Sequence, residues 1–389
     1  MRLRLRLPTV VPDEYAIPLR CPYGCGGQYF ALHQACAKAM ADPSCPEVTV
    51  RRYRCVKCRR SFRVHPTGVS RHHRSQRLRG IGVMLYVLGL SYGAVADALA
   101  AFGWAGSKSS VYRDVQAAGA AVERMRRLQP QRRVQVVSAD ATYVICNRQQ
   151  VTIAVALDAL AGDVLDIELV DSESADGLRP FLRQLQAEYG MEVLVSDDQD
   201  SYKTLTDELG VAHSVCRAHV NRNVARLTAE LAQEALRHPC PPAPPGVQSD
   251  PERVLADLEY LQLLIALRPA DGAAQLTDFL RRYQAAPPPA KGEKASFWYR
   301  MRLALLRWSN QWQRLTFDQQ WNRQHSTQPD ARLDGTNNVA ERAIGCWIKD
   351  RYRTMRTFKR LASVHNLAQL IPFLAARPDQ PLLAALLAA

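Results

Sequence analysis

Residues 134–144, Val-Gln-Val-Val-Ser-Ala-Asp140-Ala-Thr-Tyr-Val, decide the fold. The run extends back to Arg133, and its β-branched residues and alternating pattern are typical of a β-strand. Two more β-rich runs follow at 150–157 and 164–170, joined by links of hairpin length. We therefore expect three neighbouring antiparallel strands, the first of which carries a carboxylate at Asp140.

The chain then alternates between helix and strand. Residues 174–189 place apolar side chains on one helical face, and residues 201–209 are also helical in pattern. Short apolar runs at 191–195 and 211–215 indicate two buried strands. The resulting order β-β-β-α-β-α-β is that of the ribonuclease-H-like fold, an α/β class with a mixed sheet.

Three acids occupy special places in this pattern. Asp140 lies in the first strand, and Asp197 directly follows the apolar run of the fourth. Glu341 opens a helix after the polar loop Asp334-Gly-Thr-Asn-Asn-Val-Ala. Because α/β sheets usually bind ligands at the carboxyl ends of their strands, and carboxylates suit hard cations such as Mg²⁺, we expect these acids to converge around divalent metal.

Two of these assignments have alternatives. Asp198 directly follows Asp197, and a shift of one residue moves a side chain to the opposite face of a strand; Asp200 is a further candidate. Asn338 and Glu341 also fit a capping box, in which the acid only satisfies the start of its own helix. The two aspartates at strand ends favour the metal-binding interpretation of Glu341.

The N-terminal region, residues 1–70, is rich in cysteine and predicts a zinc ribbon. Six of the ten cysteines precede residue 60, and without a secretion signal metal ligation outranks disulfides. A C-x3-C pair and a C-x2-C pair on tight turns give the tetrahedral sulfur cage that structural zinc prefers. The expected ligands are Cys21, Cys25, Cys55 and Cys58. Cys36 and Cys45 lie between the pairs and leave the choice of ligands open.

A basic surplus favours a polyanion as partner. The formal net charge is +14 and the pI is about 9.5, and Arg, which greatly outnumbers Lys, suits phosphate contacts. Residues 74–127 have the outline of a helix-turn-helix, with a glycine-containing turn before a hydroxyl-rich helix. The expected DNA-binding residues are Lys57, Arg59, Arg60, Lys108, Ser110, Tyr112, Arg113, Arg342 and Lys349.

Helix-rich sequence separates the last strand from Glu341. We expect residues 221–332 to form an all-helical insertion within a catalytic core of 130–220 and 333–389. Proline-rich breaks at 239–246 and 287–292 divide this insertion. Four tryptophans either fill its core or stack on an exposed base: Trp298, Trp308, Trp312 and Trp321.

The chain shows no targeting or membrane segment. Residues 1–7 alternate Arg and Leu like an edge strand, without the apolar core of a secretion signal. Glycine and polar residues interrupt the apolar run 81–104, so two soluble helices explain it better than a membrane span. Residues 382–389 form an apolar tail that we expect on the core. We expect a cytoplasmic protein with no membrane partner.

Several motifs together resemble a known family. Asp140, Asp197 and Glu341 resemble the DDE triad of insertion-sequence transposases, and Asn337-Asn338-Val-Ala-Glu341-Arg342 looks like the third-acid motif of several bacterial groups. The motif Cys216-Arg-Ala-His219 is similar to the C-x2-H of Mutator-like and related bacterial transposases, which also carry a helical insertion before the glutamate. Each motif is short, but the ordered set covers nearly the whole chain.

The resemblance implies a Mg-dependent DDE transposase, a bacterial DNA recombination enzyme at the nucleoid. The three acids would hold two Mg²⁺ or Mn²⁺ ions, and the enzyme would cut element ends and join the 3′-hydroxyl to target DNA. Its partners would be double-stranded DNA and a second copy, in a homodimer or higher assembly. Cys216 and His219 would be accessory, as structural residues or at the scissile phosphate. The alternatives are a structure-specific nuclease without strand transfer and a DNA-binding regulator with an inactive core.

Overall fold

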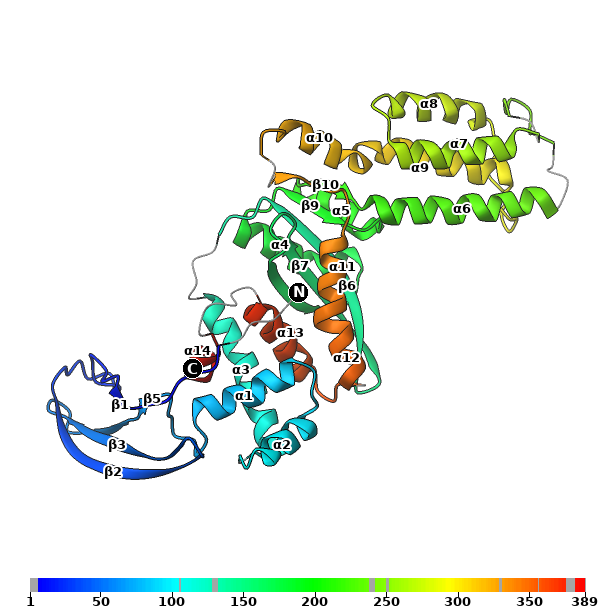
Figure 1. Ribbon diagram of the computed structural model, residues 1–389. Helices are drawn as coiled ribbons and strands as arrows, with labels where there is room; N and C mark the ends of the chain where they lie inside the picture. The colour runs from blue at the N-terminus through cyan, green and yellow to red at the C-terminus, as the bar shows by residue number, and fades with distance from the viewer. Residues whose placement is uncertain are drawn as a thin grey trace.

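The computed structural model describes residues 6–104, 106–127, 132–237, 242–249, 252–328, 331–355, 357–375 and 382–388. A mixed sheet lies in the middle of the molecule, between the N-terminal strands at one end and a group of long helices at the other (Figure 1). Within these ranges no helix is long and apolar enough to cross a membrane.

The central sheet has the strand order β10-β9-β6-β7-β8. The strands β6, β7 and β8 form an antiparallel meander, and β9 and β10 extend the sheet beyond β6 in parallel. The strands are β6 (Val136–Cys146), β7 (Gln149–Asp158), β8 (Val164–Val170), β9 (Val193–Ser196) and β10 (Ala212–Val215). With α4 (Ala175–Tyr189) and α5 (Asp200–Leu209) between them, they confirm the predicted ribonuclease-H-like mixed sheet.

Helices cover both faces of this sheet. On one face, α4 and α5 pack through Leu178, Phe181 and Tyr202. On the other, α3 (Lys108–Arg127) and α13 (Leu361–Ala375) share an apolar core with residues of β6, β7 and β8. The C-terminal helix α14 (Leu382–Ala388) packs against α1 and α3, so the predicted apolar tail does lie on the core.

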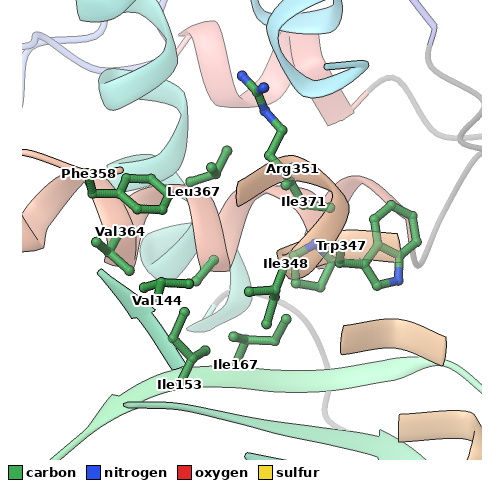
Figure 2. A pocket seen from close by; sticks show the side chains of 12 residues that line it. Val144, Ile153, Ile167, Trp347, Ile348, Arg351, Phe358, Val364, Leu367 and Ile371 are labelled. Atoms are coloured by element: carbon green, nitrogen blue, oxygen red, sulfur yellow. The ribbon is translucent and has the colours of Figure 1, made fainter. Parts of the chain in front are cut away.

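The helix that carries Glu341 has three parts. It begins as α11 (Asn338–Ala343), continues as the π-helical turn η2 (Ile344–Lys349) and ends as α12 (Asp350–Met355). The first part contacts β6 and β7. Trp347 and Ile348 of the π turn line a small apolar cavity of about 20 Å³ above the sheet (Figure 2). Single π turns inside α-helices are rare and frequently mark functional segments.

The three helices expected between residues 74 and 127 are present as α1 (Gln76–Val87), α2 (Tyr92–Ala101) and α3. Ser75 and Ser91 cap the first two, each by accepting a hydrogen bond from a backbone N–H of the first turn. Gly119 lets α3 approach α13 closely, because a Cβ there would lie 2.5 Å from the carbonyl oxygen of Asn366. The three helices therefore share one apolar core with the central sheet.

The N-terminal strands form two small antiparallel sheets. One joins β2 (Phe30–Asp42), β3 (Cys45–Cys55) and β4 (Ser61–Val64), and the other pairs β1 (Val11–Tyr15) with β5 (Pro66–Thr67). The expectation of an edge strand at 1–7 is wrong for Arg6 and Leu7, and its remaining residues lie outside the described ones. Ser75 donates to Asp42 as well as capping α1, so the tip of the β2–β3 hairpin is tied to that helix.

The expected helical insertion is occupied by long helices with a core of their own. The described helices are α6 (Arg217–Arg237), α7 (Val254–Leu267), α8 (Gly272–Tyr283), α9 (Phe297–Leu315) and α10 (Phe317–Gln324). Of the Pro-rich break at 239–246, residues 239–241 lie outside the described part. All four tryptophans are at most 6% exposed. Three of them fill the core of the insertion and Trp321 packs against β9, so none is presented for stacking on a base.

Candidate active site

Asp140 lies within β6, and Asp197 directly follows the neighbouring parallel strand β9. In the register of β6 with β9, Ser138 is opposite Val195. Asp140 comes two residues after Ser138, and the charge of Asp197 raises the pKa of Asp140. Val136 belongs to the small core that also contains Val195, so the alternation of side chains along β6 directs Asp140 to that same face of the sheet.

Asn337 fixes the start of the helix that carries Glu341. Its side chain is fully buried, accepts a hydrogen bond from the Ser138 hydroxyl and donates to the carbonyl of Ala139 at 3.2 Å. Both partners directly precede Asp140 on β6. The backbone N–H of Glu341 donates in turn to the carbonyl of Asn337 at 3.1 Å. The third acid is therefore held one helical turn from the strand that carries the first.

The capping box expected as an alternative does not form. Asn337, rather than Asn338, occupies the N-cap position of α11, and no side-chain hydrogen bond caps this helix. The side chain of Asn337 is directed into β6 instead. The carboxylate of Glu341 is 40% exposed and lies beside His219, so it does not serve the start of its own helix.

His219 lies next to Glu341 at the same edge of the sheet. Its Nε2 is 3.5 Å from Glu341 Oε1. The interaction with Cys216 raises the pKa of His219, and the charges of Glu341 and Asp197 raise it further against the effect of burial. Burial alone would raise the pKa of the Cys216 thiol, but His219 and the N–H of Asn337 outweigh it and the pKa is lowered. The C-x2-H residues thus connect the start of α6 with the region around Asp140, Asp197 and Glu341, which we call the acidic edge.

Burial and mutual repulsion act on the two aspartates. Burial raises the pKa of Asp140 to about 7, with further contributions from Asp197 and Glu173 that Ala141 N–H and His219 partly offset. Burial is also the main cause that raises the pKa of Asp197. A cation relieves such crowding of carboxylates, and oxygen donors suit Mg²⁺ or Mn²⁺. The donor set therefore fits divalent metal.

The acids share this edge without being tightly gathered. Among the residues that the structure describes, the four N-terminal cysteines are the only His, Cys, Asp or Glu group compact enough to hold one metal ion. Asp140, Asp197 and Glu341 do not form such a group. His219, which lies beside Glu341, is close enough for its charge to act on both aspartates, and Glu341 is the most exposed of the three acids.

Asp198 and Asp200 have other partners. The buried carboxylate of Asp198 pairs with Lys203 at 2.7 Å and Arg307 at 2.7 Å, and Asn223 donates to it at 3.2 Å. Asp200 is largely exposed and pairs with the same lysine at 3.1 Å. Asp198 therefore ties the end of β9 to α5 and to the insertion helices α6 and α9, which favours Asp197 as the second acid.

Glu173 is a carboxylate that the sequence analysis did not single out. It lies in the link between β8 and α4, where its Oε2 accepts a hydrogen bond from the Tyr143 hydroxyl at 2.6 Å. Its charge acts on both Asp140 and Asp197. The signal in the sequence is its place just after the third strand, the kind of position that singled out Asp197.

The four predicted zinc ligands come together at the N-terminal sheet. The sulfur atoms of Cys21, Cys25, Cys55 and Cys58 all lie within 4.8 Å of one another. The sulfur atoms of Cys21 and Cys58 are 3.7 Å apart and those of Cys25 and Cys55 are 3.6 Å apart, which matches the edge of about 3.8 Å expected for a tetrahedral sulfur site. A Cβ at Gly27 would lie 2.7 Å from the Cys55 sulfur, so this turn requires glycine. Cys36 and Cys45 lie outside the group.

The predicted DNA-binding residues around the second cysteine pair are exposed. Lys57, Arg59 and Arg60 surround the turn of the C-x2-C motif, and Arg60 lies 5.2 Å from the ring centroid of Tyr23. Arg59 adopts a positive φ of 63° within this turn. These three side chains form a basic rim on the four-cysteine cluster.

The predicted residues on helices have mixed surroundings. Lys108 and Arg113 are exposed on α3, as are Arg342 and Lys349 on the helix that carries Glu341. Ser110 is partly buried and accepts a hydrogen bond from Ser107 at 3.0 Å. The half-buried ring of Tyr112 packs on the edge of Tyr92, and its hydroxyl lies 3.3 Å from Ser363. Tyr112 therefore helps to join α3 to α2 and α13.

The strand order and the three acids define a ribonuclease-H-like protein with carboxylates at the edge of its sheet. Residues 59–238 match the family model described as "Transposase, Mutator family". This match confirms, over those residues, the resemblance to Mutator-like transposases that the motifs indicated. No curated protein matches the chain.

Solved structures with similar parts have low identity. The Drosophila P element transposase strand transfer complex is 13% identical, with a TM-score of 0.38, over 80% of this chain and 94% of that one. The HTLV-2 integrase catalytic core domain in complex with magnesium is 14% identical, with a TM-score of 0.20, over 34% of this chain and 86% of that one. At these TM-scores the two likenesses do not bear on how this chain acts.

Proposed function

We propose that this protein is a DNA transposase that cuts the ends of its element and joins the freed 3′-hydroxyl to target DNA. The observation that supports it most directly is the proximity of Asp140 in β6 to Asp197 at the end of the neighbouring β9, whose charge raises the pKa of Asp140. Glu341 is held to the same edge through Asn337, which binds the two residues before Asp140. The Mutator-family match over residues 59–238 supports the same activity.

The chemistry is phosphodiester transfer at this acidic edge. Asp140, Asp197 and Glu341 would hold two divalent ions, Mg²⁺ or Mn²⁺, which supply activation of the attacking oxygen and charge neutralisation on the phosphate. Asn337 orients the helix of Glu341, and the burial of the two aspartates limits their access to bulk water. Cys216 and His219 act as accessory residues that hold the start of α6 next to Glu341.

The N-terminal units would deliver DNA to this edge. We assign element-end binding to residues 1–70, with structural Zn²⁺ on the four cysteines, and to the helices at 74–127. The exposed basic side chains that would contact phosphates are Lys57, Arg59, Arg60, Lys108, Arg113, Arg342 and Lys349. Residues 130–220 and 333–389 form the proposed catalytic domain, with 221–332 as its helical insertion. Two element ends would require a homodimer or a larger assembly.

The test is cleavage of a labelled duplex that carries the terminal repeat flanking this reading frame, with Mg²⁺ or Mn²⁺. Asp140→Ala, Asp197→Ala and Glu341→Ala should each reduce cleavage and joining at least about 100-fold, because each removes one of three metal-binding carboxylates. End binding, measured by fluorescence anisotropy, should change less than about threefold, since none of these acids belongs to the proposed end-binding units at 1–70 and 74–127.

Three outcomes would contradict the proposal in different ways. Cleavage without joined product would make the protein a structure-specific nuclease. Binding of the duplex without cleavage by the wild type would make it a regulator with an inactive core. Retained cleavage by any of the three alanine variants would remove that residue from the site.

A further inference from the structure

Arg351 is buried where α12 meets the turn between α1 and α2. The residue is 5% exposed, and its guanidinium lies 4.1 Å from the ring centroid of Tyr86. Its Nη1 donates to the carbonyl of Gly89 at 2.9 Å, and its Nη2 donates to the carbonyl of Leu90 at 2.9 Å. Figure 2 shows this side chain directed away from the apolar cavity that Trp347 and Ile348 line.

The contact fits the chemistry of a helix end. Gly89 and Leu90 directly follow Leu88, the C-cap of α1, so Arg351 lies close to the negative end of that helix, where a cation is stabilising. Gly89 has a positive φ of 122° in the turn that follows α1. The planar fork of an Arg side chain can bind two neighbouring carbonyls at once, whereas Lys offers one point charge. The ring of Tyr86 also stacks on that of Tyr92, with the centroids 4.1 Å apart. Arg351 therefore contacts α1 directly and is linked to α2 through this stack.

The same helix holds Glu341 at its other end. Asn337 ties its first turn to β6, and Arg351 ties its last part to the α1–α2 turn. Between the two ties lies the π turn η2, above the cavity of about 20 Å³. A π turn carries one residue more than an α-helical turn, so a small displacement at Arg351 can be passed along the helix there as a change in helix register.

We propose that Arg351 is a positioning residue that couples the binding of an element end on α1–α3 to the placement of Glu341. The inference rests on the proposed function. When α1 and α2 seat on DNA, the movement of their turn reaches α12 through the Arg351 contacts and is passed through η2 to α11. Glu341, which stands on the exposed side of the acidic edge, then moves toward Asp140 and Asp197.

The test compares hydrogen exchange with and without a duplex that carries the terminal repeat. In the wild type, the duplex should slow exchange both in α1–α3 and in residues 338–355. In Arg351→Gln, slowing should persist in α1–α3 and shrink in 338–355 to what the proposed phosphate contacts of Arg342 and Lys349 give by themselves, because the fork that joins the two parts is gone. Cleavage should fall about 5- to 150-fold, the usual range for coupling between two sites, while the Kd for the duplex changes less than about threefold.

Two further variants keep the test informative. Arg351→Lys retains the charge over Tyr86 but not the fork, so it should fold and lose part of the coupling. Arg353→Gln removes the same charge from the same helix at an exposed position whose ion pair is with Asp350, and it should behave as wild type. The inference is overturned if the duplex slows exchange in 338–355 of Arg351→Gln as much as in the wild type, or if it leaves that segment unchanged in the wild type.

This result is separable from the proposed function. Slowed exchange in 338–355 without any cleavage by the wild type would keep the coupling and remove the transposase activity. Normal cleavage by Arg351→Gln with coupled exchange lost would keep the activity and remove the role of Arg351 in it.

Discussion

At the scale of single residues, the neighbouring aspartates Asp197 and Asp198 have opposite surroundings. Burial raises the pKa of Asp197, and the charges of Glu173 and Asp198 raise it further. Asp198 has two cations and an amide around its buried carboxylate. Two aspartates that are adjacent in sequence thus differ in role. Asp197 belongs to the proposed active site, and Asp198 stabilises the fold through its ion pairs.

Asp198→Ala should destabilise the protein by about 3–5 kcal/mol, because it leaves the buried charge of Lys203 with only the largely exposed Asp200 as a carboxylate partner. The matched variant Asp197→Ala removes a repelled carboxylate and should change the free energy of unfolding by less than about 1 kcal/mol. Urea unfolding in the presence of a chelator measures both. If Asp197→Ala proved the more destabilising of the two, the roles assigned to this pair would be reversed.

At the scale of elements, the approach of α3 to α13 depends on Gly119. A glycine stands in the middle of the long helix α3 because the backbone of Asn366 in α13 occupies the space that a side chain at 119 would need. Such a contact joins the three-helix unit to the helix that covers the central sheet.

Gly119→Ala should cost about 1–3 kcal/mol, because overpacking forces the two helices apart. Gly93→Ala in α2 is the control: a Cβ there would meet only the Ser91 hydroxyl oxygen at 3.8 Å, and Ala favours a helix over Gly by about 1 kcal/mol. Thermal unfolding monitored by circular dichroism compares them. Equal midpoints for the two variants would show that α3 and α13 do not need this close approach.

The elements of the central sheet were predictable because each carries a local period. The predicted strand at 164–170 and helix at 174–189 agree with β8 and α4 to within one residue. β2 was not foreseen, because Phe30–Asp42 is rich in alanine and has little β propensity of its own; its pairing with β3 decides its structure. The π turn was not foreseen either, since the spacing of apolar residues does not distinguish it from an α-helical turn.

The candidate site was predictable only in part, because only some of its residues carry a local sequence pattern. Asp140, Asp197 and Glu341 are marked by their places in the strand and helix pattern, and Cys216 and His219 by a motif. Asn337 was named as part of the third-acid motif, but its role was not foreseen, because its bonds to Ser138 and Ala139 span about two hundred residues of sequence. Contacts of that range follow from tertiary packing and leave no local pattern.

At the scale of the whole molecule, the four-cysteine cluster is remote from the acidic edge. It belongs to the sheet of β2, β3 and β4, which has a small apolar core separate from that of the central sheet. Loss of metal at the four cysteines should therefore affect DNA binding without unfolding the proposed catalytic domain.

Cys55→Ser should remove bound zinc and weaken binding of the terminal-repeat duplex about tenfold or more, since a zinc site contributes directly to the folding of its own unit. Cys36→Ser, at an exposed cysteine outside the cluster, should keep both zinc and binding. Mass spectrometry measures the bound zinc, and fluorescence anisotropy titrations measure binding of the duplex. Zinc retained in Cys55→Ser would mean that another set of ligands holds it.

The shared apolar core of α3, α13 and the central sheet limits how this protein can acquire a new end specificity. Exchange of residues 74–127 for the corresponding unit of a relative would have to preserve the buried face of α3 and the glycine at 119, or the recombinant chain would expose its interior. Point changes on the solvent side of α3 carry no such penalty. Divergence among descendants of this chain should therefore concentrate on that outer surface, with chimeric swaps confined to the zinc-bearing sheet.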